Sequence, residues 1–174
     1  MNRKKMMMQL GKQKAKDFFS FASKVKASKR MLQLKFPKNI KDFCLAKDEK
    51  EWCLYLFGSK ICEEIYGTCE PGIKGHEPLF SFILYYNQDE VKLLITLIYQ
   101  WFLMIGMKKV MAMWLYALLA VLEKPVDENF QQVLENFFAD CKNYMKEDPF
   151  DILVYYILIL LFHNFCAHSR EQLC

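Results

Sequence analysis

The chain has 174 residues, and 53% of them are apolar, which suffices for one domain with a full core and excludes a disordered protein. The net charge of +4 is unevenly spread, because the first 50 residues hold 15 Lys and Arg against 4 Asp and Glu, whereas the rest hold 9 against 16. The basic segment suits RNA phosphates, an acidic protein surface or anionic lipid. The acidic remainder argues against nucleic-acid binding by the folded domain itself.

Only six glycines and five prolines interrupt the chain, which is rich in methionine, leucine and phenylalanine. This composition favours helices over strands. We therefore predict an all-α fold, a bundle of about five or six helices preceded by a basic amphipathic helical arm.

The first predicted element is a basic helix over residues 9–34. Its apolar positions, which include Phe18, Phe21 and Val25, recur every three to four residues between lysines. We divide the chain after this element, into a basic arm at residues 1–45 and a helical domain at residues 46–174.

A short helix follows the arm, and a loop follows the helix. Asp48 is a helix-capping residue, with Glu49 and Glu51 in the first turn, and the helix extends to about Ile61. Three glycines and a proline within residues 63–77 predict a surface loop.

The next elements are two apolar helices. Asn87 or Asp89 can cap a helix that runs to about Phe102, and its inward positions are Leu93, Leu94, Leu97, Ile98 and Trp101. Gly106 permits the turn into a second helix, residues 113–125, which is apolar nearly all round and must be surrounded.

Two further helices complete the prediction. Asp127 is a plausible N-cap for a helix that runs to about Met145. Pro149 is a natural first-turn residue for the last helix, from Ile152 to about Ala167.

The segment MWLYALLAVLEKP, residues 113–125, resembles the signature of the gem-associated protein 2 family, also called the SMN-interacting protein one family. KDEKEWCLYLFGSKIC at 47–62, PLFSFILYYNQ at 78–88 and the Trp101-Phe102 pair agree with that family in the same order. The resemblance implies a non-enzymatic scaffold of the survival-of-motor-neuron (SMN) complex, which loads Sm proteins onto small nuclear RNAs.

The resemblance also implies a binding mechanism. An amphipathic SMN helix packs into a groove on the bundle, and another face holds Sm proteins. We expect no cofactor, and a cytoplasmic and nuclear location that includes nuclear gems. RNA, bound by the basic arm, is a further partner that the sequence leaves open. The expected wall of the groove, or its direct support, consists of Phe80, Leu84, Trp101, Trp114, Leu118 and Leu122.

Two departures from the family pattern stand out. Family members begin with a long extended arm around the Sm ring, whereas this chain has almost nothing before the predicted helix at residues 9–34, which we interpret as a short form. The family tends to carry an arginine immediately before the tryptophan of the signature, and this chain has Met113 there.

Other functions have weaker support in the sequence. No common catalytic motif occurs, so we do not expect an enzyme. His163, Cys166 and His168 lack the second ligand pair of a zinc site, so we expect no metal. The seven cysteines form no CxxC pair, and no signal peptide is evident before Phe18, which favours a reduced intracellular compartment.

A C-terminally membrane-anchored helical protein with a basic cytosolic arm is the main alternative. Residues 152–169 contain no charged side chain. Only residues 152–162 are continuously apolar or aromatic, however, and a bilayer span needs about 20 such residues. A buried core helix is the favoured interpretation.

Overall fold

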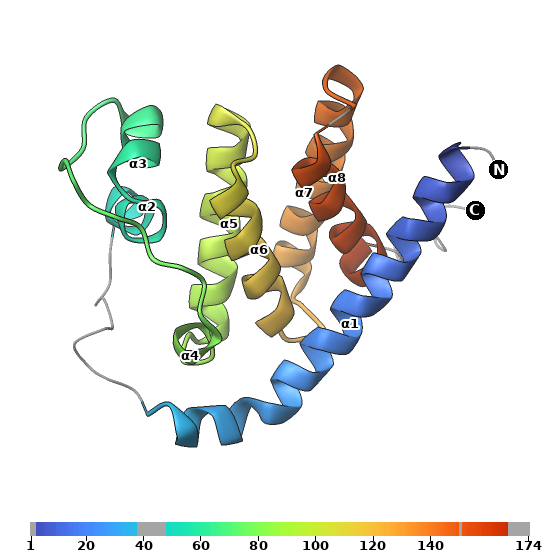
Figure 1. Ribbon diagram of the computed structural model, residues 1–174, viewed down its shortest axis with the longest axis horizontal. Coiled ribbons are helices and arrows are strands. Elements are labelled where there is room, and N and C mark those ends of the chain that lie inside the picture. The colour runs from blue at the N-terminus through green and yellow to red at the C-terminus, as the bar shows by residue number, and fades with distance from the viewer. Residues whose placement is uncertain (1–2, 38–47, 150, 167–174) are drawn as a thin grey trace. The chain divides into compact units, whose positions relative to one another are not determined.

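The computed structural model describes residues 3–37, 48–149 and 151–166. This part of the chain contains eight α-helices and a closing π-helical turn, with no strand apart from an isolated bridge between Gly58 and Lys74 (Figure 1). The prediction of an all-α fold is confirmed. The chain divides into two compact units, one of residues 1–26 with 123–174 and one of residues 27–122. The predicted boundary at residues 45 and 46 falls outside the described residues and stays a prediction.

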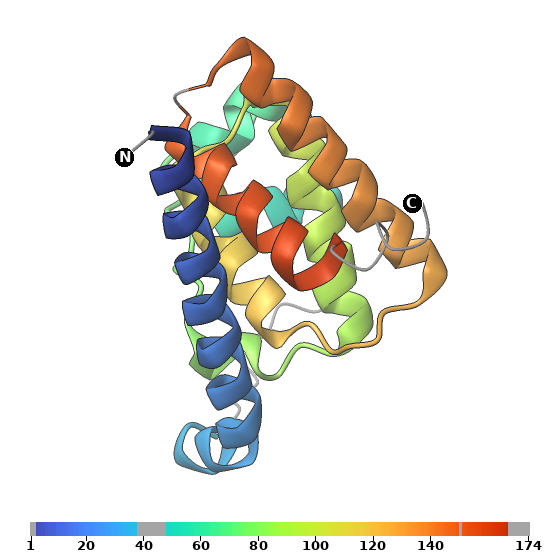
Figure 2. The same ribbon diagram turned by 90° about the vertical axis from the view of Figure 1, so that its right-hand side faces the viewer.

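The first unit contains the beginning of helix α1 (Arg3–Lys35), which confirms the predicted basic helix and starts it earlier. A buried stripe at three- and four-residue spacing runs along α1 and consists of Ala15, Phe18, Ala22 and Val25. Gly11 lets α1 approach helix α8 (Ile152–Leu161), because a Cβ at Gly11 would lie 2.9 Å from Cδ1 of Ile159. Figure 2 shows the two helices side by side.

Helix α7 (Glu128–Glu147) and α8 complete the first unit, together with the π-helical turn η2 (Phe162–Cys166). The predicted cap of α7 is confirmed, since the amide of Phe130 donates to Asp127 Oδ1 at 2.9 Å. The prediction for Pro149 is wrong. The helix begins after Asp151, whose carboxylate accepts from the amide of Val154 at 3.0 Å. The predicted end near Ala167 lies outside the described residues.

The second unit contains helices α2 (Glu49–Phe57) and α3 (Ser59–Tyr66). Asp48 and Glu51 form a reciprocal capping box, with distances of 2.8 and 3.0 Å between amide nitrogen and carboxylate oxygen. The prediction of one helix to Ile61 is wrong. Gly58, with φ at 80°, breaks it into two.

The loop after α3 is held closely against α2. A Cβ on Gly75 would lie 2.5 Å from the carbonyl oxygen of Leu56, so the backbone of the loop at Gly75 packs directly against the backbone of α2. The imidazole of His76 stacks on the ring of Tyr55 with 4.0 Å between centroids. The indole Nε1 of Trp114 donates to the carbonyl of His76 at 2.9 Å, which ties the loop to the apolar core.

The core of the second unit is built from α4 (Phe80–Ile83), α5 (Gln88–Ile105) and α6 (Lys109–Val121). Asn87, one of the two predicted candidates, caps α5 in a capping box with Glu90. Gly106, with φ at 77°, ends α5, and the chain enters α6 four residues before the predicted start. The expectation that Leu93 faces inward is wrong, because this side chain is 45% exposed.

None of the helices within the described ranges combines the length and the apolar character that crossing a membrane requires. The alternative of a C-terminal membrane anchor therefore has no supporting helix there.

Candidate partner-binding site

Five of the six residues predicted for the groove are buried within the second unit. Trp101, Trp114, Leu118 and Leu122 are at most 2% exposed, and Leu84 is 3% exposed, while Phe80 is half-buried. The indole Nε1 of Trp101 donates to the hydroxyl of Tyr66 at 3.0 Å, so this polar group is satisfied inside the unit. These side chains form the interior that supports the helix faces. Their role in partner binding stays a prediction.

Several apolar side chains of α5 are exposed outside this interior. Leu93, Leu103 and Met104 are 45%, 55% and 61% exposed. All charged residues of α5 lie within its first five positions, and residues 93–105 carry none. A surface helix of a globular protein normally presents charged or polar residues on its outer face. The outer face of α5 is therefore of the kind that marks an interaction site.

Helix α6 adds one more exposed apolar side chain. Residues 106–108 return the chain so that α6 packs beside α5 (Figure 1). Met113 on α6 is 43% exposed, in contrast to its buried neighbour Trp114. We use the name α5 face for the exposed apolar side chains of the α5 and α6 pair, which are Leu93, Leu103, Met104 and Met113.

The sequence prediction missed the α5 face, although one signal for it is present. Residues 93–105 carry more apolar side chains than a single buried stripe of a helix can use. We assigned Leu93 to the interior and made no assignment for Leu103 or Met104, because periodicity alone does not tell which of two adjoining apolar stripes is covered.

Four of the described cysteines, Cys53, Cys62, Cys141 and Cys166, have raised pKa values that do not favour nucleophilic catalysis. Burial raises the pKa of the Cys62 thiol to about 11 and that of Cys166 to about 12. Burial likewise raises the pKa values of Cys53 and Cys141, so these thiols stay protonated at neutral pH, whereas the thiolate is the reactive form.

Two members of the histidine and cysteine cluster near the end of the chain, His163 and Cys166, lie within the described residues. Cys166 Sγ lies 3.8 Å from the carbonyl oxygen of Leu134, to which it donates inside the first unit. His168 lies outside the described residues. Within those residues, no group of three or more His, Cys, Asp or Glu side chains could hold a metal ion.

An all-α module with a packed aromatic interior, protonated thiols and an uncovered apolar helix face has the architecture of a binding protein. Residues 9–162 match the family described as survival motor neuron (SMN) interacting protein 1 (SIP1), and the chain belongs to that family. Membership assigns it a function in the SMN complex, in the assembly of small nuclear ribonucleoproteins.

The fold has a counterpart among solved structures. The chain is similar to one chain of the 8S snRNP assembly intermediate, with a TM-score of 0.64 and 17% sequence identity. The similarity covers 94% of this chain and 71% of that one. At this identity it establishes a shared fold.

Proposed function

We propose that the α5 face binds an amphipathic helix of the SMN protein. The observation that supports this most directly is the exposed, uncharged stretch of α5 from Leu93 to Met104. An amphipathic helix can cover such a surface with side chains at positions i, i+3, i+4 and i+7. Family membership supplies the identity of the partner.

The composition of the α5 face suits an apolar contact. Methionine is flexible and polarizable, so Met104 and Met113 can adapt to the shape of a partner helix. Met113 occupies the position where we expected an arginine from the family resemblance. At this position the partner helix would meet a thioether, and the contact there would depend little on salt.

The proposal extends to a scaffold without enzymatic activity. Another face of the protein would hold Sm proteins, while the SMN helix occupies the α5 face. Such a scaffold would work in the cytoplasm and the nucleus, including nuclear gems. The family match supports this assembly role, and the raised pKa values of the Cys62 and Cys166 thiols agree with it.

The experiment is a calorimetric titration of the full chain with a peptide of the N-terminal helical segment of SMN from the same organism. We expect Met104→Glu to weaken binding about tenfold or more, because a carboxylate would be desolvated against an apolar helix. Leu103→Glu is expected to act in the same direction.

Ile152→Glu is the matched control, since Ile152 is 78% exposed and lies on α8, in the other unit. The control should bind the peptide as the unmodified chain does. Circular dichroism should show the same helix content for all variants, because the three substituted side chains are exposed. Equal binding by Met104→Glu and Ile152→Glu would refute the α5 face as the docking site.

A further inference from the structure

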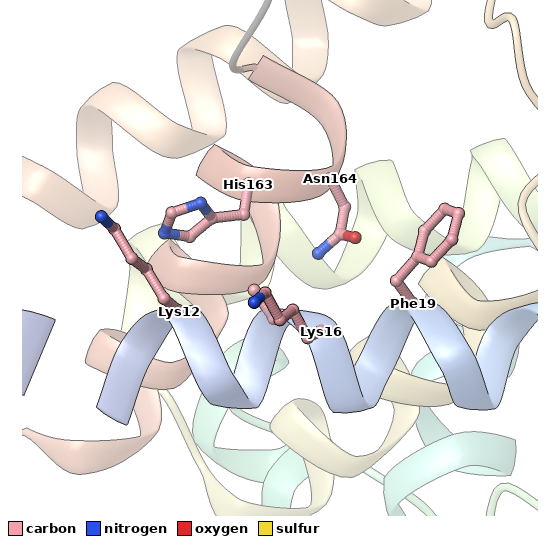
Figure 3. A pocket seen from close by; sticks show the side chains of 6 residues that line it. Lys12, Lys16, Phe19, His163 and Asn164 are labelled. Atoms are coloured by element: carbon pink, nitrogen blue, oxygen red, sulfur yellow. The ribbon is translucent and has the colours of Figure 1, made fainter. Parts of the chain in front are cut away.

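A cavity of about 400 Å³ lies in the first unit, between α1 and η2. We call it the α1 pocket. It is lined by Lys12, Ala15, Lys16, Phe19, His163 and Asn164. The four α1 residues are spaced i, i+3, i+4 and i+7, which places them on one face of the helix. In Figure 3, His163 points toward Lys12, and Asn164 points toward α1 between Lys16 and Phe19.

The α1 pocket is electropositive. Lys12 and Lys16 are exposed, and no carboxylate within the described ranges forms an ion pair with either. The nearest acidic residue in sequence, Asp17, accepts a hydrogen bond on Oδ1 from the side-chain Nε2 of Gln13 at 2.9 Å. Partial burial, and secondly the charge of Lys12, lower the pKa of His163. Burial disfavours charge on this imidazole, and the positive charge of Lys12 adds to that effect, so His163 lines the pocket mainly as a neutral side chain at pH 7.

A third ammonium group adjoins the wall of the α1 pocket. Lys124 Nζ donates to the backbone carbonyl of Asn164 and lies 4.4 Å from the ring centroid of Phe165. Burial, and then the charge of Lys26, lower the pKa of Lys124. Glu123 partly offsets the charge of Lys26. Lys124 therefore adds to the positive potential on the η2 side of the cavity.

An aromatic side chain completes the α1 pocket. Phe19 is 60% exposed, although Phe18 beside it is only 2% exposed. A solvent-exposed phenyl ring next to ammonium groups is the arrangement with which proteins hold single-stranded nucleic acid, because bases stack on the ring and phosphates meet the cations. The cavity volume is within the range of sites for small organic ligands, and it is larger than an inorganic anion needs.

We infer that the α1 pocket binds one nucleotide of a single-stranded RNA, with the phosphate at Lys12 and Lys16 and the base against Phe19. An acidic peptide or an anionic lipid would use the same lysines, but neither requires an exposed aromatic ring. The inference uses residues of the first unit alone, and it goes beyond the proposed docking of an SMN helix on the second unit.

The test is fluorescence anisotropy of a labelled single-stranded oligouridylate with the full chain, at several salt concentrations. The double variant Lys12→Ala and Lys16→Ala should weaken binding about tenfold or more and reduce the salt slope by about 0.7, the value for one phosphate of a single strand that is no longer neutralised. Phe19→Ala should weaken binding about fivefold or more with an unchanged salt slope, because stacking does not release counterions.

The matched control is the double variant Lys14→Ala and Lys24→Ala, which removes the same charge from exposed positions of α1 outside the pocket. It should retain most of the affinity. A second control, Phe19→Trp, keeps an aromatic surface and should bind RNA at least as well as the unmodified chain.

Three results would overturn the inference. The first is an equal loss of affinity in both lysine double variants, and the second is no effect of Phe19→Ala, since either would indicate attraction by the net charge of the helix. The third is tighter binding to phosphatidylserine vesicles or to polyglutamate than to RNA, with the same dependence on Lys12 and Lys16. The substituted side chains are exposed, so unchanged circular dichroism is expected throughout.

Discussion

At the scale of single residues, two glycines determine how the loop after α3 is attached. Gly58 adopts φ of 80°, and a Cβ there would lie 2.6 Å from the backbone nitrogen of Gly75. A Cβ on Gly75 would in turn lie 2.5 Å from the carbonyl oxygen of Leu56. Both positions therefore require a residue without a side chain, because the obstructing atoms belong to the backbone and cannot rotate away.

We predict that Gly75→Ala lowers the free energy of unfolding by about 1–3 kcal/mol, the usual cost of overpacking. The loop must shift away from Leu56, which also disturbs the stacking of His76 on Tyr55. Urea denaturation followed by tryptophan fluorescence would measure the change. Thr68→Ala, at an exposed position of the same loop, should change stability by less than about 0.5 kcal/mol. Equal stability of the two variants would contradict the crowding argument.

At the scale of elements, helix caps explain why several predicted boundaries agree with the structure. Asp48, Asn87 and Asp127 each accept a hydrogen bond from the amide of the third helical residue. A cap is a local interaction between residues that are close in sequence, so the sequence alone reveals it. The sequence prediction missed the break at Gly58, because this break depends on a contact with the loop segment around Gly75, which is distant in sequence.

We predict that Asn87→Ala destabilises the protein by about 0.5–2 kcal/mol, because the amide of Glu90 loses its acceptor, which lies at 2.8 Å. Thermal unfolding followed by circular dichroism would show a lower Tm. Asn129→Ala provides the comparison, since Asn129 is exposed within the first turn of α7 and alanine is a good helix former. The capping role would be refuted if both variants unfolded at the same temperature.

At the scale of the whole molecule, the two proposed binding surfaces belong to different units. The α5 face lies on residues 27–122, whereas the α1 pocket is built from residues 1–26 and 123–174. The surfaces share no residue. Effects of substitutions at separate sites without shared partners are usually additive.

We therefore predict that Met104→Glu leaves the affinity for oligouridylate unchanged, and that the double variant Lys12→Ala and Lys16→Ala leaves the affinity for the SMN peptide unchanged. Each variant would be measured in both titrations. Because each variant is measured in both titrations, the RNA inference and the proposed SMN contact are tested independently. One of them can fail while the other holds. Loss of both activities in either variant would contradict independent surfaces.

Local patterns in the chain were enough to predict the all-α fold, most helix caps, the glycine-containing loop and the family. These features depend on neighbouring residues and on helical periodicity. Packing between distant segments decided the rest. It left Leu93 exposed, and it brought Lys12 and Lys16 next to His163 and Asn164. Periodicity shows that a helix has apolar sides, but only the neighbours supplied by the fold determine which side remains open to a partner.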